Sequence, residues 1–341
     1  MERITASVTS VSWIPSGLVE GLLRAPFDMR FINYDEPLPD RVGDLDRWRS
    51  AALFRFANRL EAWIDVEDGR VVGAGHAGAG VIGRTKLGPG HLLSVPAIGF
   101  PDLRPPVERT DSAVRFVQTA GGQPPLLAPR MVTGSRRWTL RPPLVWTTLS
   151  LTIAADGSSS FEVVGASQFP RHWIYDGRGD LAQKVGLTDF DEWYHRTSLE
   201  ESSPWGGADL APVVTAAESA LERELSKGIM HGAASPAIRR LSEGAVLVRQ
   251  GDPGREVYLV LDGVLGVEVD GEHIADVGPG VVIGERAALS PDHRRTATVR
   301  ALTPVRVAAI DADALQPDAL RELELGHRRE DEPQDRLGRL Q

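Results

Sequence analysis

Alternating apolar and polar residues, interrupted by glycine-containing turns, recur along most of the chain. Residues 4–13 have this period of two, and so do the runs on either side of Asp68-Gly69, which are 60–66 and the run that starts at Val71. A period of two places successive side chains on opposite faces of a β-strand, and an Asp-Gly dipeptide is typical of a tight hairpin turn. The first range is therefore a predicted strand, and the second pair is a predicted hairpin.

Two further patterns complete the prediction for the N-terminal part. Residues 144–153 and 161–164 form a second predicted hairpin across Ala155-Asp156-Gly157, and residues 45–58 are a predicted helix. An initial strand, helices, a meander of strands and a closing helix resemble the helix-grip fold of ligand-binding cavity proteins, although no motif accompanies this arrangement. We therefore expect an α+β domain that is rich in strands.

The C-terminal part has shorter apolar runs at a tighter rhythm. These runs are 246–248, 257–261, 264–269, 274–277 and 303–310. Turns at 251–254 and at Asp270-Gly271 join the first pair and the second pair of runs, which predicts two hairpins. Short strands at this spacing build a small barrel or roll.

A change in aromatic content marks the boundary between the two parts. All eight Trp residues precede residue 206. Apolar residues from Val214 to Leu225 then recur at helical spacing, with Thr215 and Glu218 arranged as a capping box, which predicts a helix over 213–229. Glycine and proline between 227 and 236 favour a linker. The predicted divisions are an α+β domain at 1–206, a connecting helix and linker at 207–235, a β-roll at 236–325 and a charged tail at 326–341.

Composition narrows the classes of function. The 341 residues exceed what one hydrophobic core usually supports, which agrees with two domains. The lack of cysteine excludes disulfides, thiolate zinc sites and thiol catalysis. The net charge of -9 opposes non-specific binding to nucleic acid or anionic lipid. The sequence starts without a signal-peptide pattern, and no run reaches the roughly 20 apolar residues of a membrane span. We expect a cytoplasmic protein that does not enter a membrane.

Three motifs occur in order within the C-terminal part. They are Gln250-Gly251-x-x-Gly254, Leu261-x-Gly263, and Gly284-Glu285 followed by Arg295-Thr296-Ala297. Together they resemble the turn, the Leu-x-Gly and the phosphate cassette of cyclic-nucleotide-binding domains of the catabolite-activator and protein-kinase-regulatory-subunit type. The resemblance covers about a quarter of the chain. It implies a β-roll with short flanking helices that binds cyclic AMP or cyclic GMP.

The resemblance also implies a role for each residue of the cassette. Glu285 would accept the ribose 2′-hydroxyl, Arg295 would pair with the cyclic phosphate, and the N–H groups of Ala287 and Ala288 would bind the same phosphate. Thr296 would touch the base without deciding between adenine and guanine, and cyclic AMP is the ligand that we favour. A helix N-terminus and a guanidinium both suit an anionic phosphate on physical grounds alone. The predicted binding residues are Gly284, Glu285, Ala287, Ala288, Arg295 and Thr296.

Two arginines depart from the family pattern. Arg286 stands where the family usually has an apolar residue, and Arg294 adds a second cation next to the proposed phosphate ligand. An alternative is that the roll keeps its fold without its ligand, with Glu285 and Arg295 joined in an ion pair.

Other motifs lack the context that their chemistry requires. Residues 73–78 have the spacing of a dinucleotide-binding loop, but no helical pattern follows, so we predict a strand or tight turn there. Four histidines match no metal-binding template, and we predict neither a metal nor catalytic residues. Residues 311–341 are too few for the DNA-reading domain of the catabolite-activator type, so we expect no direct DNA binding. The histidines are His76, His91, His172 and His195.

Three hypotheses follow for the whole protein. In the first, the C-terminal roll binds a cyclic nucleotide and acts on the N-terminal domain or on a protein partner through the predicted connecting helix. In the second, the N-terminal domain is an enzyme that the roll gates. In the third, the roll is a structural module that forms a homo-oligomer.

Overall fold

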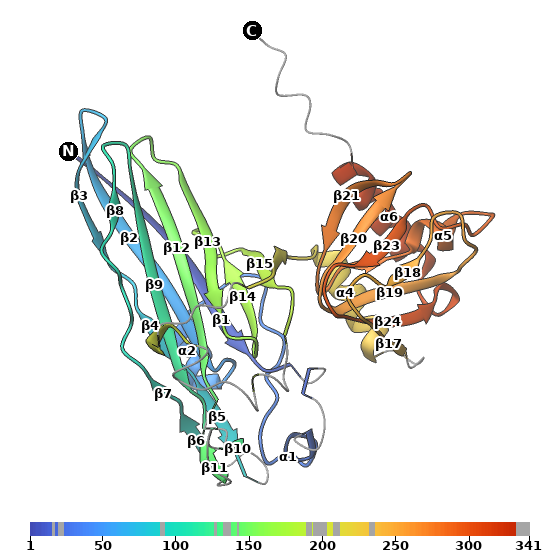
Figure 1. Ribbon diagram of the computed structural model, residues 1–341, viewed down its shortest axis with the longest axis horizontal. Coiled ribbons are helices and arrows are strands. Elements are labelled where there is room, and N and C mark those ends of the chain that lie inside the picture. The colour runs from blue at the N-terminus through green and yellow to red at the C-terminus, as the bar shows by residue number, and fades with distance from the viewer. Residues whose placement is uncertain are drawn as a thin grey trace. The chain divides into compact units, whose positions relative to one another are not determined.

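The protein is described here by a computed structural model in which two compact units follow each other along the chain, Met1–Val214 and Thr215–Gln341 (Figure 1). Strands dominate both units. The residues that the structure describes are 1–15, 18–19, 24–88, 93–125, 128–131, 138–141, 143–188, 193, 203–206, 212–231 and 236–331.

In the first sheet of the N-terminal unit, β15, β14, β1, β2 and β3 lie side by side in that order as antiparallel neighbours, and β4 also pairs with β2. The strand predicted over 4–13 is confirmed as β1, and the hairpin predicted at Asp68-Gly69 is confirmed as β2 and β3. Asp68 and Gly69 have φ of 50° and 72°, which is the left-handed backbone that this turn requires. The strands are β1 (Glu2–Trp13), β2 (Phe56–Glu67), β3 (Arg70–His76), β4 (Gly80–Ile82), β14 (Arg171–Tyr175) and β15 (Leu181–Val185).

The second sheet has the order β13-β12-β9-β7, with β8 paired to β9. The predicted hairpin across 155–157 is confirmed as β12 and β13. The strands are β7 (Ile98–Gly99), β8 (Glu108–Arg109), β9 (Ala113–Gln123), β12 (Val145–Ala154) and β13 (Ser159–Ala166), and two separate hairpins are β5 (Arg84–Leu87) with β6 (Leu93–Pro96) and β10 (Ala128–Met131) with β11 (Trp138–Arg141).

The two sheets pack face to face, with a buried apolar cluster between them. Leu60 and Ile64 from β2 meet Phe116 from β9 and Leu149 from β12 in a single buried cluster. Alternate residues of each strand supply this cluster, which is why the period of two was visible in the sequence. The helix-grip resemblance is not confirmed, because the sheets cover each other, and the described helices of this unit, α1 (Arg24–Asp28) and α2 (Leu45–Ala51), are short.

The helix predicted over 45–58 is correct only in its first half. Asp44 caps α2 by accepting hydrogen bonds from two backbone N–H groups, and Ala52 ends the helix in the left-handed conformation. Strand β2 begins at Phe56. The apolar residues after Ala52 therefore serve the buried face of a strand, and tertiary packing overrides their helical spacing.

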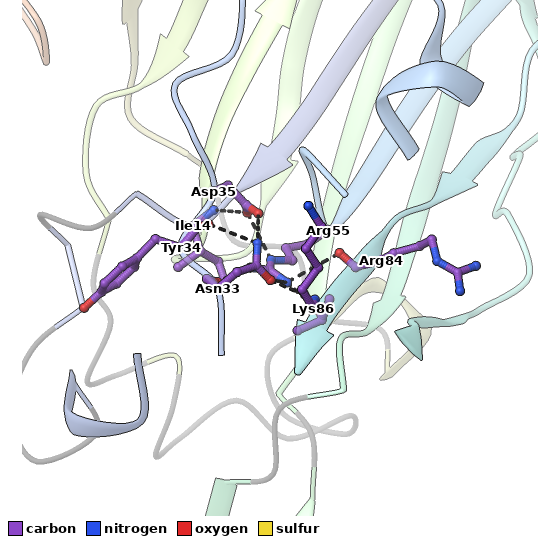
Figure 2. A network of polar contacts seen from close by, with 8 residues as sticks. Ile14, Asn33, Tyr34, Asp35, Arg55, Arg84 and Lys86 are labelled. Carbon is purple, nitrogen blue, oxygen red and sulfur yellow. Dashed lines mark hydrogen bonds and ion pairs between the residues drawn. The ribbon is translucent and has the colours of Figure 1, made fainter. Parts of the chain in front are cut away.

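A buried polar network fixes a loop to the first sheet (Figure 2). The Arg55 guanidinium donates to Asp35 Oδ2 at 3.0 Å, to Thr85 Oγ1 at 2.6 Å and to the Asn33 carbonyl at 2.7 Å. The Ile14 N–H donates to the same Asp35 oxygen at 2.8 Å. Both charged side chains are fully buried, and burial raises the pKa of Asp35 to about 6. This network has a structural role, since its charges lie away from solvent and bind each other.

His172 is a second buried polar group of this unit. Its Nε2–H donates to the Ser167 carbonyl at 2.8 Å, because a carbonyl only accepts, and Nδ1 then accepts from Ser12 Oγ at 2.8 Å. Burial, together with a smaller contribution from the neighbouring Arg171, lowers the pKa of His172 to about 4. His172 is thus a neutral core histidine. His91 and His195 lie outside the described residues.

The C-terminal unit is a roll of two antiparallel sheets, with strand orders β17-β24-β19-β22 and β18-β23-β20-β21. The hairpin predicted at Asp270-Gly271 is confirmed as β20 and β21. The hairpin predicted across 251–254 is wrong, because β18 pairs with β23 and β19 pairs with β24, in different sheets. The strands are β17 (Ala237–Leu241), β18 (Val246–Val248), β19 (Glu256–Asp262), β20 (Leu265–Val269), β21 (Glu272–Val277), β22 (Val282–Ile283), β23 (Thr298–Ala301) and β24 (Val305–Asp311).

Helices flank this roll. Helix α4 starts five residues after Thr215, so the helix predicted over 213–229 began too early, and the capping pair is Ser219 with Glu222. It also continues through the predicted linker start, because Leu225 and Ile229 pack into the core of the roll. The remaining elements are β16 (Val214–Ala216), α4 (Ala220–His231), α5 (Glu285–Leu289), α6 (Pro317–Asp331) and the 3-10 turns Pro204–Gly206 and Ala312–Ala314. Residues 207–211, 232–235 and 332–341 of the predicted connector and tail lie outside the described ranges.

Candidate functional site

The roll holds a cavity of about 380 Å³, within the range of roughly 300 to 1,000 Å³ that is usual for small-molecule sites. Apolar side chains of β20 and β21, such as Val267 and Ile274, form one wall. The cassette residues form another wall. Five of the six predicted binding residues line this cavity, namely Gly284, Glu285, Ala287, Arg295 and Thr296.

The backbone of Arg295 is fixed by the loop that carries the Gln-Gly-x-x-Gly motif. The Arg295 N–H donates to the Asp252 carbonyl at 2.9 Å, and the Gly251 N–H donates to the Arg295 carbonyl at 2.8 Å. These bonds join residues of the two motifs that are more than 40 positions apart in the sequence. The first motif positions the cation of the second.

The Arg295 side chain is 5% exposed and lies along the ring of Tyr258. Its guanidinium donates to the Glu256 carbonyl at 2.8 Å and to the Tyr258 hydroxyl at 3.4 Å. These contacts use two of its five N–H donors. A Cβ at Gly254 would lie 2.6 Å from Arg295 Nη2, so only glycine lets the loop approach the guanidinium this closely. The cation is held in one orientation at the cavity wall.

Tyr258 is the centre of the polar group behind Arg295. Its hydroxyl donates to Glu256 Oε2 at 2.8 Å, and Arg239 pairs with Glu256 and lies over the Tyr258 ring. Burial raises the pKa of Tyr258, and the hydrogen bond to Glu256 raises it further. The phenol therefore keeps its proton and continues to orient Glu256.

Glu285 begins helix α5 directly after Gly284, whose φ is 98°. Its side chain is buried, and it forms an ion pair with Arg286 at 3.8 Å. The contacts described for Arg295 are with Glu256 and Tyr258. Arg286 is one of the two departures from the family pattern. It therefore contacts Glu285, the residue predicted to bind the ribose, and it also lines the cavity.

The two alanines of α5 have different surroundings. Ala287 is buried and lines the cavity, whereas Ala288 is not part of the lining, and its N–H donates to the Gly284 carbonyl at 3.2 Å. The first N–H groups of any helix lack an intrahelical acceptor and are available to an anion. The ligand roles of Ala287, Ala288 and Thr296 stay predictions.

Sequence reasoning missed one wall of the cavity. Residues just before and at the start of α4 line it, although the pattern had placed them inside a continuous helix. The signal that was present is the spacing of Ser219 and Glu222, which matches a capping box. The missed lining residues are Ala216, Ala217, Glu218, Ser219 and Glu222.

Three other expectations concern the glycine motif at 73–78, metal binding and membrane spans. Strand β3 covers the first glycines of the 73–78 motif and β4 follows it, as predicted from the strand-like pattern. Within the described ranges, no group of three His, Asp or Glu side chains is arranged to hold a metal ion. No helix in that part of the chain is both long and apolar enough to cross a bilayer.

Residues 238–317 match the family model of the cyclic nucleotide-binding domain. The C-terminal third of the chain contains a cyclic nucleotide-binding domain. This domain coincides with the roll and contains the whole cassette. The match covers less than half of the chain, so the family applies to this part alone.

The individual relatives also match only a part of this chain. The Pycsar effector protein PaPycTIR of Pseudomonas aeruginosa is 35% identical over 75 residues, which are 22% of this chain and 24% of that protein. Among solved structures, the N-terminal domain of a transcriptional regulator from Streptomyces coelicolor A3(2) is 30% identical, with 35% and 88% of the two chains covered and a TM-score of 0.25. A cyclic nucleotide-binding domain from Methylobacillus flagellatus KT is 25% identical, with 30% and 68% covered and a TM-score of 0.27.

Proposed function

We propose that this protein is a cyclic nucleotide sensor whose C-terminal roll takes up cyclic AMP and passes the occupied state to its N-terminal unit or to a protein partner. The supporting observation is that a buried cation and a buried carboxylate, Arg295 and Glu285, line one cavity of suitable size. A cyclic phosphodiester needs a cation, and a ribose hydroxyl needs an acceptor. The proposal places the protein in the cytoplasm, with which a chain lacking cysteine is compatible.

Three features of the cavity support this proposal. A guanidinium that is already oriented by Tyr258 and Glu256 loses little freedom when it meets a phosphate. A largely desolvated site also strengthens a charge-assisted hydrogen bond. The valine and isoleucine side chains of β20 and β21 offer apolar surface to a purine. Cyclic AMP remains our preferred ligand, and Thr296 does not by itself decide between cyclic AMP and cyclic GMP.

A calorimetric titration of the full chain tests this function. Cyclic AMP, and then cyclic GMP, is added while tryptophan fluorescence is recorded in parallel. Every Trp precedes residue 206, so a fluorescence change would report on the first unit or its surroundings. Saturable heat with a fluorescence change is the expected result. Absence of heat with both nucleotides would contradict the proposal and favour the structural module that forms an oligomer.

A further inference from the structure

The residues that join the two units form part of the nucleotide cavity. We call residues 215–222 the connecting segment, and it follows directly after Val214, the last residue of the N-terminal unit. Five of its eight residues line the cavity that also contains Arg295 and Glu285. A ligand in that cavity would therefore meet the connecting segment itself.

The connecting segment rests on a turn that has no room for side chains. A Cβ at Gly278 would lie 2.0 Å from Thr215 Oγ1, and a Cβ at Gly280 would lie 2.3 Å from Glu218 Cδ. Real Cβ atoms do not approach other atoms so closely, so both positions need glycine while the segment is in place. The turn is itself anchored, because the Gly280 N–H donates to the Val260 carbonyl at 2.8 Å. Gly278 and Gly280 are thus a seat for the segment.

Glu222 connects this segment to the strand that leads into the cassette. Its Oε2 accepts from the Ser219 N–H at 2.8 Å and from Ser219 Oγ at 3.0 Å, and its Oε1 accepts from the Val282 N–H at 3.1 Å. Val282 lies in β22, two residues before Gly284. One buried carboxylate therefore fixes both the cavity wall and the start of the phosphate cassette.

We propose that the connecting segment is the element that transmits nucleotide occupancy, through a coupled equilibrium between nucleotide binding and its docking on the Gly278–Gly280 seat. This inference rests on the proposed function. A ligand that contacts the docked wall binds the docked arrangement more tightly, and thermodynamic linkage then requires docking to favour the ligand by the same factor. The segment is joined directly to Val214 of the N-terminal unit, so a change in its position can pass to that unit.

A unique thiol measures docking directly, because the chain has no cysteine. Ala217→Cys places that thiol in the cavity wall, and Ser242→Cys places one at an exposed turn outside the lining. Saturating cyclic AMP, or cyclic GMP if only that nucleotide gives heat, should slow maleimide alkylation of Ala217→Cys at least about fivefold, a typical coupling factor. The Ser242→Cys rate should stay unchanged. Nucleotide heat without a change in the Ala217→Cys rate would overturn the proposal.

Linkage provides the reciprocal test. Gly278→Ala should weaken nucleotide binding at least about fivefold and accelerate alkylation of Ala217→Cys, since the seat is then blocked. Gly228→Ala on α4 is the matched control, because a Cβ there meets nothing within 4 Å. Equal affinity of Gly278→Ala and Gly228→Ala would overturn the coupling.

A last measurement avoids substitutions. Hydrogen exchange of the unmodified chain should show slower exchange in peptides covering 215–222 when nucleotide is bound, and unchanged exchange there despite binding heat would also overturn the coupling. If no nucleotide gives heat, the proposed function itself fails, and this inference fails with it. The two failures are therefore distinguished by calorimetry.

Discussion

Arg295→Ala removes a guanidinium that is 5% exposed and already oriented at the cavity wall. Truncating one partner of a desolvated charge pair costs roughly 2 to 5 kcal/mol. Each 1.4 kcal/mol corresponds to about tenfold in affinity, so the dissociation constant for cyclic AMP should rise at least about 25-fold. The lower end of the range applies if water enters the cavity and partly replaces the guanidinium.

Calorimetry on matched variants measures this loss. Arg295→Lys should also weaken binding, because an ammonium cannot reproduce the planar pair of hydrogen bonds. Arg249→Ala removes the same charge from an exposed position outside the cavity lining and should bind as the unmodified chain does. Circular dichroism and thermal unfolding verify that each variant is folded. A change below about threefold for a folded Arg295→Ala, which is less than 1 kcal/mol, would refute the assignment of Arg295 to the phosphate.

Three more predictions concern the packing around the site and in the N-terminal unit. Gly254→Ala should weaken nucleotide binding by about tenfold, measured by calorimetry, because the new Cβ would displace the Arg295 guanidinium; unchanged affinity would contradict this. Arg55→Ala should lower the free energy of unfolding by roughly 3 to 5 kcal/mol in urea, since it leaves Asp35 buried without its partner; a loss under about 1 kcal/mol would contradict it. Folded His172 has a pKa of about 4 against an ordinary 6.5, so the unfolded chain binds the extra proton between these values. The contribution of His172 to the free energy of unfolding is therefore fully present above pH 6.5, and about 3 kcal/mol of it is lost as the pH drops to 4. A His172→Gln variant measured in urea at both pH values should lack this fall, and an equal fall would contradict the assignment.

The sequence by itself determined the features that depend on neighbouring residues. The hairpins at Asp68-Gly69 and Asp270-Gly271 were predicted correctly, because the left-handed turn residues and the alternating strands that they join are adjacent in the chain. The cassette was likewise readable, since Gly284 to Thr296 is one continuous stretch with distinctive chemistry. Local backbone preference and local spacing were sufficient for these parts.

Only the tertiary structure decided which distant segments meet. Strand β18 pairs with β23 and not with its neighbour in sequence, because alternation specifies a buried face but not a partner. The start of α4 was misplaced because Thr215-x-x-Glu218 and Ser219-x-x-Glu222 have the same spacing, and the contact between Glu222 and Val282, 60 residues away, distinguishes them. The same long-range packing brings the connecting segment into the wall of the roll's cavity. A wall built across such distances leaves no periodic pattern in the sequence.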